Sequence, residues 1–189
     1  MSGFFLVLSP CVSDIIDIAW AQDGLRLASC SVDNTGSTSY NASASPFQCI
    51  ATLRGHGGPV KGVAWDPAGR YLATQAEGLG VRIWRVSDWQ EESKISKPFV
   101  KVIQVTRLSW SPDGSVIVAP HAINNRFPTA QLINRNHWRP GLDLVGHEKH
   151  VVCAMDNVGA GTQAIGPTVL TTNALEVQKP AVPPLHSFS

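Results

Sequence analysis

The sequence predicts an all-β fold made of repeated antiparallel sheets, and an internal repeat is the first observation behind this prediction. Three tryptophans recur at intervals of 65 − 20 = 45 and 110 − 65 = 45 residues: Trp20, Trp65 and Trp110. Three glycines keep the same interval: Gly24, Gly69 and Gly114. Several positions in step over two periods indicate a repeated structural unit.

The second observation is that each unit alternates apolar and small residues with a period of two. Val63 and Trp65 would share one face of a strand, with Ala64 between them. This alternation is typical of a strand and not of a helix. The turn sequence Asp-Pro-Ala-Gly follows at 66–69, and a second apolar run follows the turn at 71–75. Proline and glycine suit the corners of a tight turn, so each unit contains an antiparallel strand pair.

A period near 45 built from short strands predicts β-propeller blades of the WD40 type. We expect about three blades, near residues 14–54, 55–98 and 99–145, and the start of a further blade at 146–152. Because a propeller commonly closes with four to eight blades, this would be an incomplete propeller. The expected third strands lie at 81–84 and 130–133, whereas the first unit loses its third strand at 36–45. Residues 34–46 carry no charge and four serines, which is typical of a flexible insertion.

The middle blade carries most of a structural hydrogen-bonded set. In WD40 blades a histidine, a strand hydroxyl, a turn aspartate and a tryptophan lock the strands together, and His56, Thr74 and Trp84 match three of these positions. The aspartate is missing, since Glu77-Gly78 occupies the turn. We expect Trp20, Trp65 and Trp110 to be core residues that pack the blades.

Composition fits a globular binding protein better than a nucleic-acid binder. The 189 residues include 15 basic and 14 acidic side chains, and 43% are hydrophobic. A nearly neutral chain argues against direct, phosphate-dominated nucleic-acid binding. The four cysteines are isolated and show no zinc spacing, which favours a reducing, intracellular compartment.

No catalytic, cofactor-binding or metal-binding constellation is predicted, and we expect no enzyme and no cofactor. His147 and His150 have a spacing that could ligate a metal, but Gly146-His147 matches the start of a blade and no third ligand is evident. The serines form no nucleophile elbow and the glycines form no phosphate loop.

The two ends of the chain differ from the repeats. Residues 1–13 form an atypical segment whose apolar run is too short for a signal peptide, and no stretch is long enough to span a membrane. Residues 153–189 contain few charges and no tryptophan, and prolines recur in them, so we expect a disordered tail.

Several motifs together resemble the amino-terminal WD40 propeller of the HIRA histone chaperone family, over roughly residues 14–152. They are LASCSVDNT at 27–35, ATLRGH at 51–56, VKGVAWDP at 60–67, WR at 84–85, DWQ at 88–90, KPF at 97–99, RLSWSPDG at 107–114, HA at 121–122, PTAQ at 128–131 and GH at 146–147. LASCSVDNT, and RLSWSPDG with PTAQ, belong to no generic WD40 consensus. The matched region is similar to the middle blades of the family's propeller only.

The resemblance implies a nuclear, non-enzymatic interaction module. It implies replication-independent chromatin assembly and transcriptional repression, including that of histone genes. The implied partners are a ubinuclein-type subunit, other histone-chaperone complex subunits and, indirectly, histones. Two alternatives stay open at this point: a generic WD40 scaffold, such as a ubiquitin-ligase substrate receptor, or a truncated, non-functional fragment.

Overall fold

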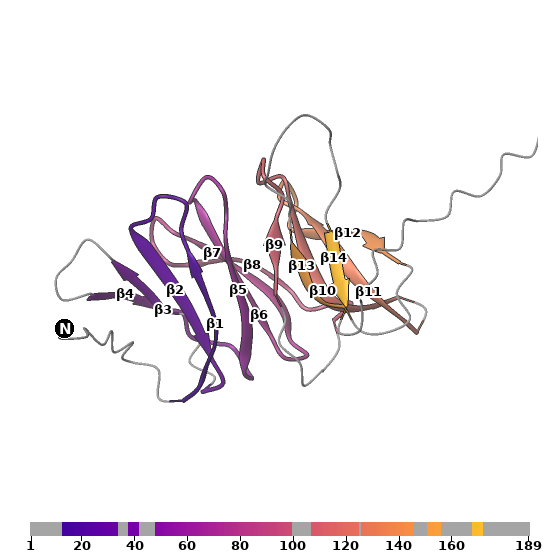
Figure 1. Ribbon diagram of the computed structural model, residues 1–189, viewed down its shortest axis with the longest axis horizontal. Coiled ribbons are helices and arrows are strands. Elements are labelled where there is room, and N and C mark those ends of the chain that lie inside the picture. The colour runs from indigo at the N-terminus through magenta and orange to yellow at the C-terminus, as the bar shows by residue number, and fades with distance from the viewer. Residues whose placement is uncertain are drawn as a thin grey trace, which may run out of the picture.

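The computed structural model describes residues 13–33, 38–41, 48–99, 107–124, 126–145, 151–155 and 168–171. Throughout these residues the regular structure is β-strand, arranged as three four-stranded antiparallel sheets and one two-stranded sheet. The sheets follow one another in chain order, side by side (Figure 1). This is the arrangement of consecutive propeller blades, as the repeat predicted. In the described part of the chain, no helix is long and apolar enough to cross a membrane.

Each of the three four-stranded sheets falls within one of the predicted blade ranges, and its strands pair in sequence order. Blade 1 contains β1 (Ile15–Trp20), β2 (Arg26–Ser31), β3 (Thr38–Asn41) and β4 (Gln48–Thr52). Blade 2 contains β5 (Val60–Trp65), β6 (Tyr71–Ala76), β7 (Gly80–Arg85) and β8 (Glu91–Ile95). Blade 3 contains β9 (Ser109–Trp110), β10 (Val116–Asn124), β11 (Phe127–Asn134) and β12 (Arg139–Leu144).

The same register closes the first hairpin of every blade. The repeat tryptophan faces the second residue of the next strand in each case: Trp20 faces Leu27, Trp65 faces Leu72 and Trp110 faces Ile117. The intervening turns each place a glycine at positive φ, with values of 67°, 68° and 68° at Gly24, Gly69 and Gly114. Glycine adopts this left-handed conformation without the steric cost of a Cβ, so the repeated glycine fixes the repeated turn.

The prediction that blade 1 lacks a third strand is wrong. Thr38–Asn41 forms β3 and pairs with both β2 and β4, with Leu27 opposite Tyr40. The segment is poor in large apolar residues, but Thr38 and Tyr40 belong to the types that favour strands. In blade 3 the expected strand at 130–133 lies inside the longer β11.

A fourth unit follows blade 3. Val151–Met155 forms β13 and pairs with β14 (Thr168–Thr171), and β13 contacts β10 and β11 of blade 3. Met155 stands 155 − 110 = 45 residues after Trp110, so β13 continues the repeat register. The prediction of disorder is therefore wrong for residues 153–155 and 168–171, whose backbones pair as a hairpin. The remainder of that tail, and residues 146–150 at the predicted start of this unit, lie outside the described residues.

The hydrophobic core lies between neighbouring blades. One cluster joins blades 1 and 2, and includes Ala28, Cys30, Val63 and Leu72. A second joins blades 2 and 3, and includes Ala73, Ile83, Ile117 and Ile133. Neighbouring blades therefore bury the faces that they turn toward each other, as expected of stacked repeats.

Trp65 and Trp110 are core residues, with 7% and 5% of their surface exposed, but Trp20 is 55% exposed. The prediction that Trp20 is a core residue is therefore wrong. Trp65 and Trp110 pack toward the preceding blade, and no described strand lies against the corresponding side of β1. Ile18, on the same face of β1 as Trp20, is 57% exposed for the same reason.

Candidate functional site

The three side chains that were predicted to lock blade 2 form one buried hydrogen-bonded chain. The Trp84 indole Nε1 donates to the Thr74 hydroxyl oxygen at 3.0 Å, and that hydroxyl lies 2.8 Å from His56 Nε2. Because Thr74 Oγ1 already accepts from Trp84, its own hydrogen is available to donate to His56 Nε2. The chain ties the segment before β5 to β6 and β7.

Burial and, to a smaller extent, the nearby Arg82 guanidinium together lower the pKa of His56 to about 4. The ring is therefore neutral at physiological pH and carries its hydrogen on Nδ1 when Nε2 accepts from Thr74. Among the described residues no side chain pairs with His56 Nδ1, and a contact with the backbone of Leu53 raises the His56 pKa only in part against burial. The turn aspartate is missing here: Gly78 lies 78 − 33 = 45 residues after Asp33, while Glu77 pairs instead with Lys61 at 2.7 Å.

The turns of blades 2 and 3 gather at one end of each sheet, which we call the turn face. It comprises the turns after the first strand, 66–70 and 111–115, and the turns before the fourth strand, 86–90 and 135–138. Backbone hydrogen bonds join them in the same way in both blades: Val86 N donates to Arg70 O at 3.0 Å, and Arg135 N donates to Ser115 O at 2.9 Å. Val86 and Arg135 are therefore equivalent positions.

Two further tryptophans of the turn face were given no packing role from the sequence, although Trp89 belongs to the DWQ motif at 88–90. Trp89 packs edge-on against Trp65, and Trp138 packs edge-on against Trp110, each with ring centroids 6.1 Å apart. Both adopt positive φ, 58° and 48°. Leu72 pairs with Trp84 in blade 2, and the equivalent Ile117 pairs with Ile133 in blade 3. Each of the two tryptophans lies five residues after Trp84 or Ile133, and this spacing is the sequence signal that could have identified them.

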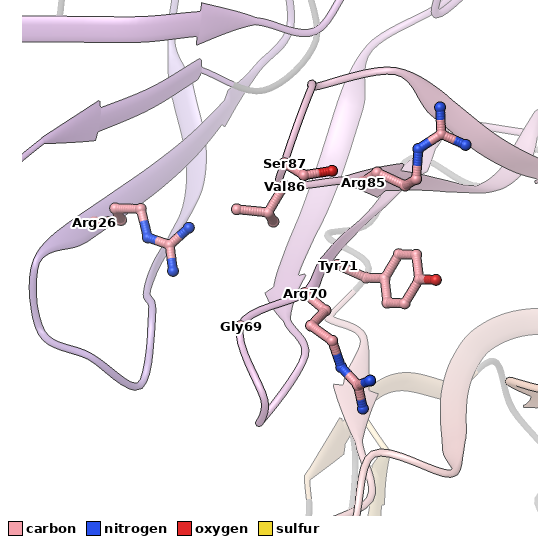
Figure 2. A pocket seen from close by; sticks show the side chains of 7 residues that line it. All are labelled: Arg26, Gly69, Arg70, Tyr71, Arg85, Val86 and Ser87. Atoms are coloured by element: carbon pink, nitrogen blue, oxygen red, sulfur yellow. The ribbon is translucent and has the colours of Figure 1, made fainter.

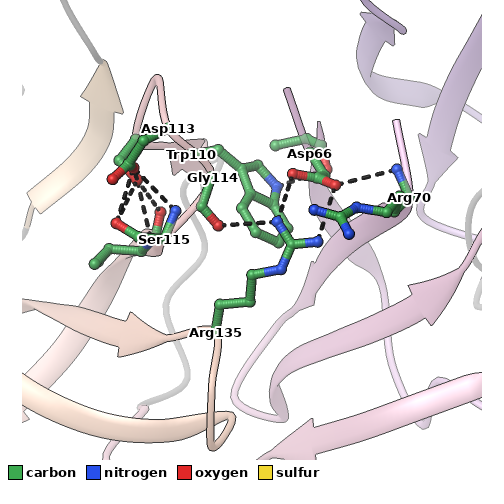
Figure 3. Close-up of polar contacts among 10 residues, drawn as sticks. Asp66, Arg70, Trp110, Asp113, Gly114, Ser115 and Arg135 are labelled. Atoms are coloured by element: carbon green, nitrogen blue, oxygen red, sulfur yellow. Dashed lines mark hydrogen bonds and ion pairs between the residues drawn. The ribbon is translucent and has the colours of Figure 1, made fainter. Parts of the chain in front are cut away.

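At the junction of blades 2 and 3, an ion pair between Asp66 and Arg135 lies between the turns of the turn face (Figure 3). Arg135 reaches from blade 3 to the fully buried carboxylate of Asp66, with Nη1–Oδ1 and Nη2–Oδ2 distances of 3.2 and 3.5 Å. The same guanidinium donates to the Gly114 carbonyl at 3.2 Å and lies 5.0 Å from the centre of the Tyr71 ring. Asp66 also accepts from the backbone N–H of Arg70 at 3.1 Å.

At the junction of blades 1 and 2, the equivalent place is a hollow of about 450 Å³ (Figure 2). Its lining residues are Arg26, Gly69, Arg70, Tyr71, Arg85, Val86 and Ser87. Val86 stands where blade 3 has Arg135, and Ala21 stands 66 − 21 = 45 residues before Asp66. Two short apolar side chains thus replace the ion pair, and the space is left open.

The cations that line the hollow differ in their partners. Arg26 pairs with Asp23 at 2.7 Å and lies 5.3 Å from the centre of the Trp65 ring. Arg85 pairs with Asp88 and Glu92 at 2.9 and 2.7 Å, and the hydrogen bonds that Arg85 donates to Asp88 raise the Arg85 pKa. Arg70 is exposed and its guanidinium has no ion-pair partner in the described part of the chain.

Comparison with known proteins identifies what these blades are similar to. Residues 7–35 and 47–85 match the WD domain, G-beta repeat family. The chain is 49% identical to Protein HIRA of Homo sapiens over 76% of its length, and 42% identical to Protein HIR1 of Cryptococcus neoformans over 77%. It is 35% identical to Protein hir1 of Schizosaccharomyces pombe over 72%. The chain belongs to the HIRA/HIR1 family.

The match to the HIRA/HIR1 family concerns a limited part of its members. The chain spans 14%, 17% and 15% of the lengths of these human, Cryptococcus and Schizosaccharomyces relatives. The resemblance read from the motifs is thus confirmed, and it concerns the WD40 blades of the HIRA/HIR1 proteins.

The innermost strands of this HIRA/HIR1 family chain also carry a polar link. Asp17 accepts from the backbone N–H of Val63 at 3.3 Å and lies 3.8 Å from Arg107 Nε. Asp17, Gly62 and Arg107 occupy the same repeat position in blades 1, 2 and 3. The link between Asp17 and Arg107 therefore crosses blade 2 at Gly62, which has no side chain. Burial raises the Asp17 pKa.

The structure brings together no candidate metal ligands among the described residues, where no group of three or more His, Cys, Asp or Glu could hold an ion. His147 and His150, whose spacing suggested the metal alternative, lie outside the described residues.

Proposed function

We propose that the chain is a non-enzymatic interaction module of a histone chaperone that acts in the nucleus. In this proposal it takes part in replication-independent chromatin assembly and in transcriptional repression, including that of histone genes. The observation that carries the proposal is the identity of 42–49% with Protein HIR1 of Cryptococcus neoformans and Protein HIRA of Homo sapiens over about three quarters of the chain.

The geometry supports binding by a rigid surface. The His56–Thr74–Trp84 chain is buried, and the aromatic pairs at Trp65 and Trp110 hold the turns of blades 2 and 3 against their strands. A surface whose turns are already ordered loses little conformational entropy when a partner binds. The proposed partners are a ubinuclein-type subunit and other subunits of the chaperone complex, through which histones are reached indirectly.

The test is direct binding of the purified chain to purified candidates. The immobilised chain is presented with a recombinant ubinuclein-type subunit, with histones H3–H4, and with a cullin adaptor protein, and binding is measured by biolayer interferometry. The Trp65→Ala variant serves as a matched control, since loss of that buried side chain is expected to loosen the junction of blades 1 and 2.

Saturable binding of the ubinuclein-type subunit that weakens at least tenfold in Trp65→Ala supports the proposal. Histone binding that appears only when this subunit is present supports the indirect route to histones. Binding of the cullin adaptor without the ubinuclein-type subunit would overturn the proposal in favour of a ubiquitin-ligase scaffold.

A further inference from the structure

The two junctions of the turn face are built on the same plan but are filled differently. At the junction of blades 2 and 3, the buried Asp66 carboxylate and the Arg135 guanidinium occupy the space and satisfy each other. At the junction of blades 1 and 2, the equivalent positions hold Ala21 and Val86. Val86 lines the hollow at the position where the longer Arg135 side chain fills the next junction.

The hollow keeps cations but has no acid in its lining. Arg26, Arg70 and Arg85 line it, and no aspartate or glutamate does. The acids that pair with Arg26 and Arg85 stand outside the lining, and Arg70 has no ion-pair partner among the described residues. Figure 2 shows the Arg26 guanidinium reaching from blade 1 toward Val86 and Gly69 of blade 2, while Arg70 and Arg85 point to opposite sides.

We propose that the hollow binds an acidic side chain on an extended segment of a protein partner, which takes the place that Asp66 holds at the next junction. Carboxylates form short, charge-assisted hydrogen bonds with guanidinium groups. Arg26 is within reach of the hollow, and Arg70 supplies the cation without an ion-pair partner at its rim. This inference deepens the proposed function, since it names the chemistry of the segment that the module recognises.

The charge of the whole chain favours a protein segment over a nucleic acid. With 15 basic and 14 acidic residues, the chain lacks the broad basic surface that phosphate-dominated binding requires. The hollow has an apolar wall at Val86, and Arg70 is the arginine of its lining without an ion-pair partner among the described residues. An apolar wall beside a cation suits the side chains that flank an acidic residue in a peptide.

The test uses fluorescence anisotropy with a fluorescein-labelled hexaglutamate peptide and a matched hexaglutamine peptide. We expect saturable, salt-sensitive binding of hexaglutamate and at least tenfold weaker binding of hexaglutamine. Arg70→Glu is expected to weaken hexaglutamate binding at least tenfold. Arg139→Glu, which changes an exposed arginine on β12 outside the hollow, is the charge-matched control and is expected to change binding less than twofold.

A second variant fills the hollow without changing the net charge. Ala21→Asp combined with Val86→Arg recreates the pair found at the next junction, and is expected to abolish hexaglutamate binding while the unfolding temperature stays the same or rises. Equal binding of hexaglutamate by this variant and the wild type would overturn the proposal, as would equal effects of Arg70→Glu and Arg139→Glu. Displacement of hexaglutamate by oligo-dT at lower concentration than by unlabelled hexaglutamate would also overturn it, in favour of a nucleic acid.

The same double variant separates this inference from the proposed function. If the ubinuclein-type subunit binds the wild type and the filled variant equally well, the module function stands and the acidic-segment inference fails. If hexaglutamate binds the wild type but no chaperone subunit does, the hollow stands and the proposed function fails.

Discussion

The Trp65 indole Nε1 donates a hydrogen bond to the backbone carbonyl of Ala19 at 2.9 Å, and this bond joins blade 2 to blade 1. It recurs one repeat later, where Trp110 Nε1 donates to the Ala64 carbonyl at 3.2 Å. In both cases donor and acceptor are 46 residues apart. The repeat tryptophan thus links each blade to the one before it, both by apolar contact and by a hydrogen bond.

This relationship predicts different costs for the same substitution at equivalent positions. Trp65→Ala removes a side chain that is 7% exposed and its hydrogen bond, so the free energy of unfolding should fall by about 3–5 kcal/mol. Trp20→Ala, at a side chain that is 55% exposed, should cost less than about 1 kcal/mol. Thermal and urea unfolding followed by circular dichroism measure both. Similar losses for the two variants would contradict the assigned role of the repeat tryptophan.

The Thr74 hydroxyl holds two buried ring nitrogens, and its removal should be costly. Thr74→Val keeps the shape of the side chain but leaves Trp84 Nε1 without its acceptor and His56 Nε2 without its partner. We expect a loss of about 2–4 kcal/mol in the free energy of unfolding, because buried polar groups are left unpaired. Thr74→Ser, which keeps the hydroxyl and loses a methyl group, is the matched control and should cost about 1 kcal/mol. A larger loss for serine than for valine would show that packing dominates at this position.

The neutral His56 ring makes stability depend on pH in a defined window. Its pKa is about 4 in the folded chain, because of burial, against about 6.5 for an unperturbed histidine. Between these values the unfolded chain binds a proton that the folded chain does not, so stability is full above about pH 6.5 and falls as pH decreases toward 4. The full difference between the two pKa values corresponds to a loss of about 3 kcal/mol in the free energy of unfolding.

The measurement is the unfolding temperature of the wild type and of His56→Gln from pH 7.5 to 4. The wild type should lose more stability than the variant over this range. The raised pKa of Asp17 acts in the opposite direction in acid, but it is common to both proteins and cancels in their difference. Parallel pH profiles would exclude His56 as the source of the dependence.

The blades could be predicted from the sequence because the interval of 45 residues between blades is constant from the first strand to the glycine of the turn that follows it. The register then fails at the third strand: Trp84 and Ile133 face the equivalent residues Leu72 and Ile117 but are 133 − 84 = 49 residues apart. The pairing of Asp66 with Arg135, and the hollow at the equivalent place, could not be found from a fixed interval of 45.

Other misses have separate physical causes. Trp20 has the pattern of a core residue, but burial depends on what lies beside β1, which its own residues do not encode. The strand at Thr38–Asn41 is held by pairing with neighbours on both sides and not by apolar side chains that a pattern would reveal. Backbone pairing of this kind leaves a weak trace in the sequence.

The turn glycines provide a final, closely matched comparison. Gly24 and Gly114 have the same positive φ, 67° and 68°, but a Cβ at Gly24 would meet no atom within 4 Å, whereas one at Gly114 would lie 2.8 Å from the Asp66 carboxylate. Gly24→Ala should therefore cost only the strain of alanine in the left-handed region, about 1–2 kcal/mol. Gly114→Ala adds the crowding of a buried ion pair, for an additional loss of about 1–3 kcal/mol.

Urea unfolding of the two glycine variants in parallel isolates the contribution of the Asp66–Arg135 ion pair between blades 2 and 3. Repeating the pair of measurements in an Asp66→Ala background should reduce the difference between them, because the nearest atom that the new Cβ would crowd is gone. If the difference persists unchanged in that background, the crowding arises from Arg135, whose Nη1 would lie 3.1 Å from the new Cβ, and not from the contact between Gly114 and Asp66.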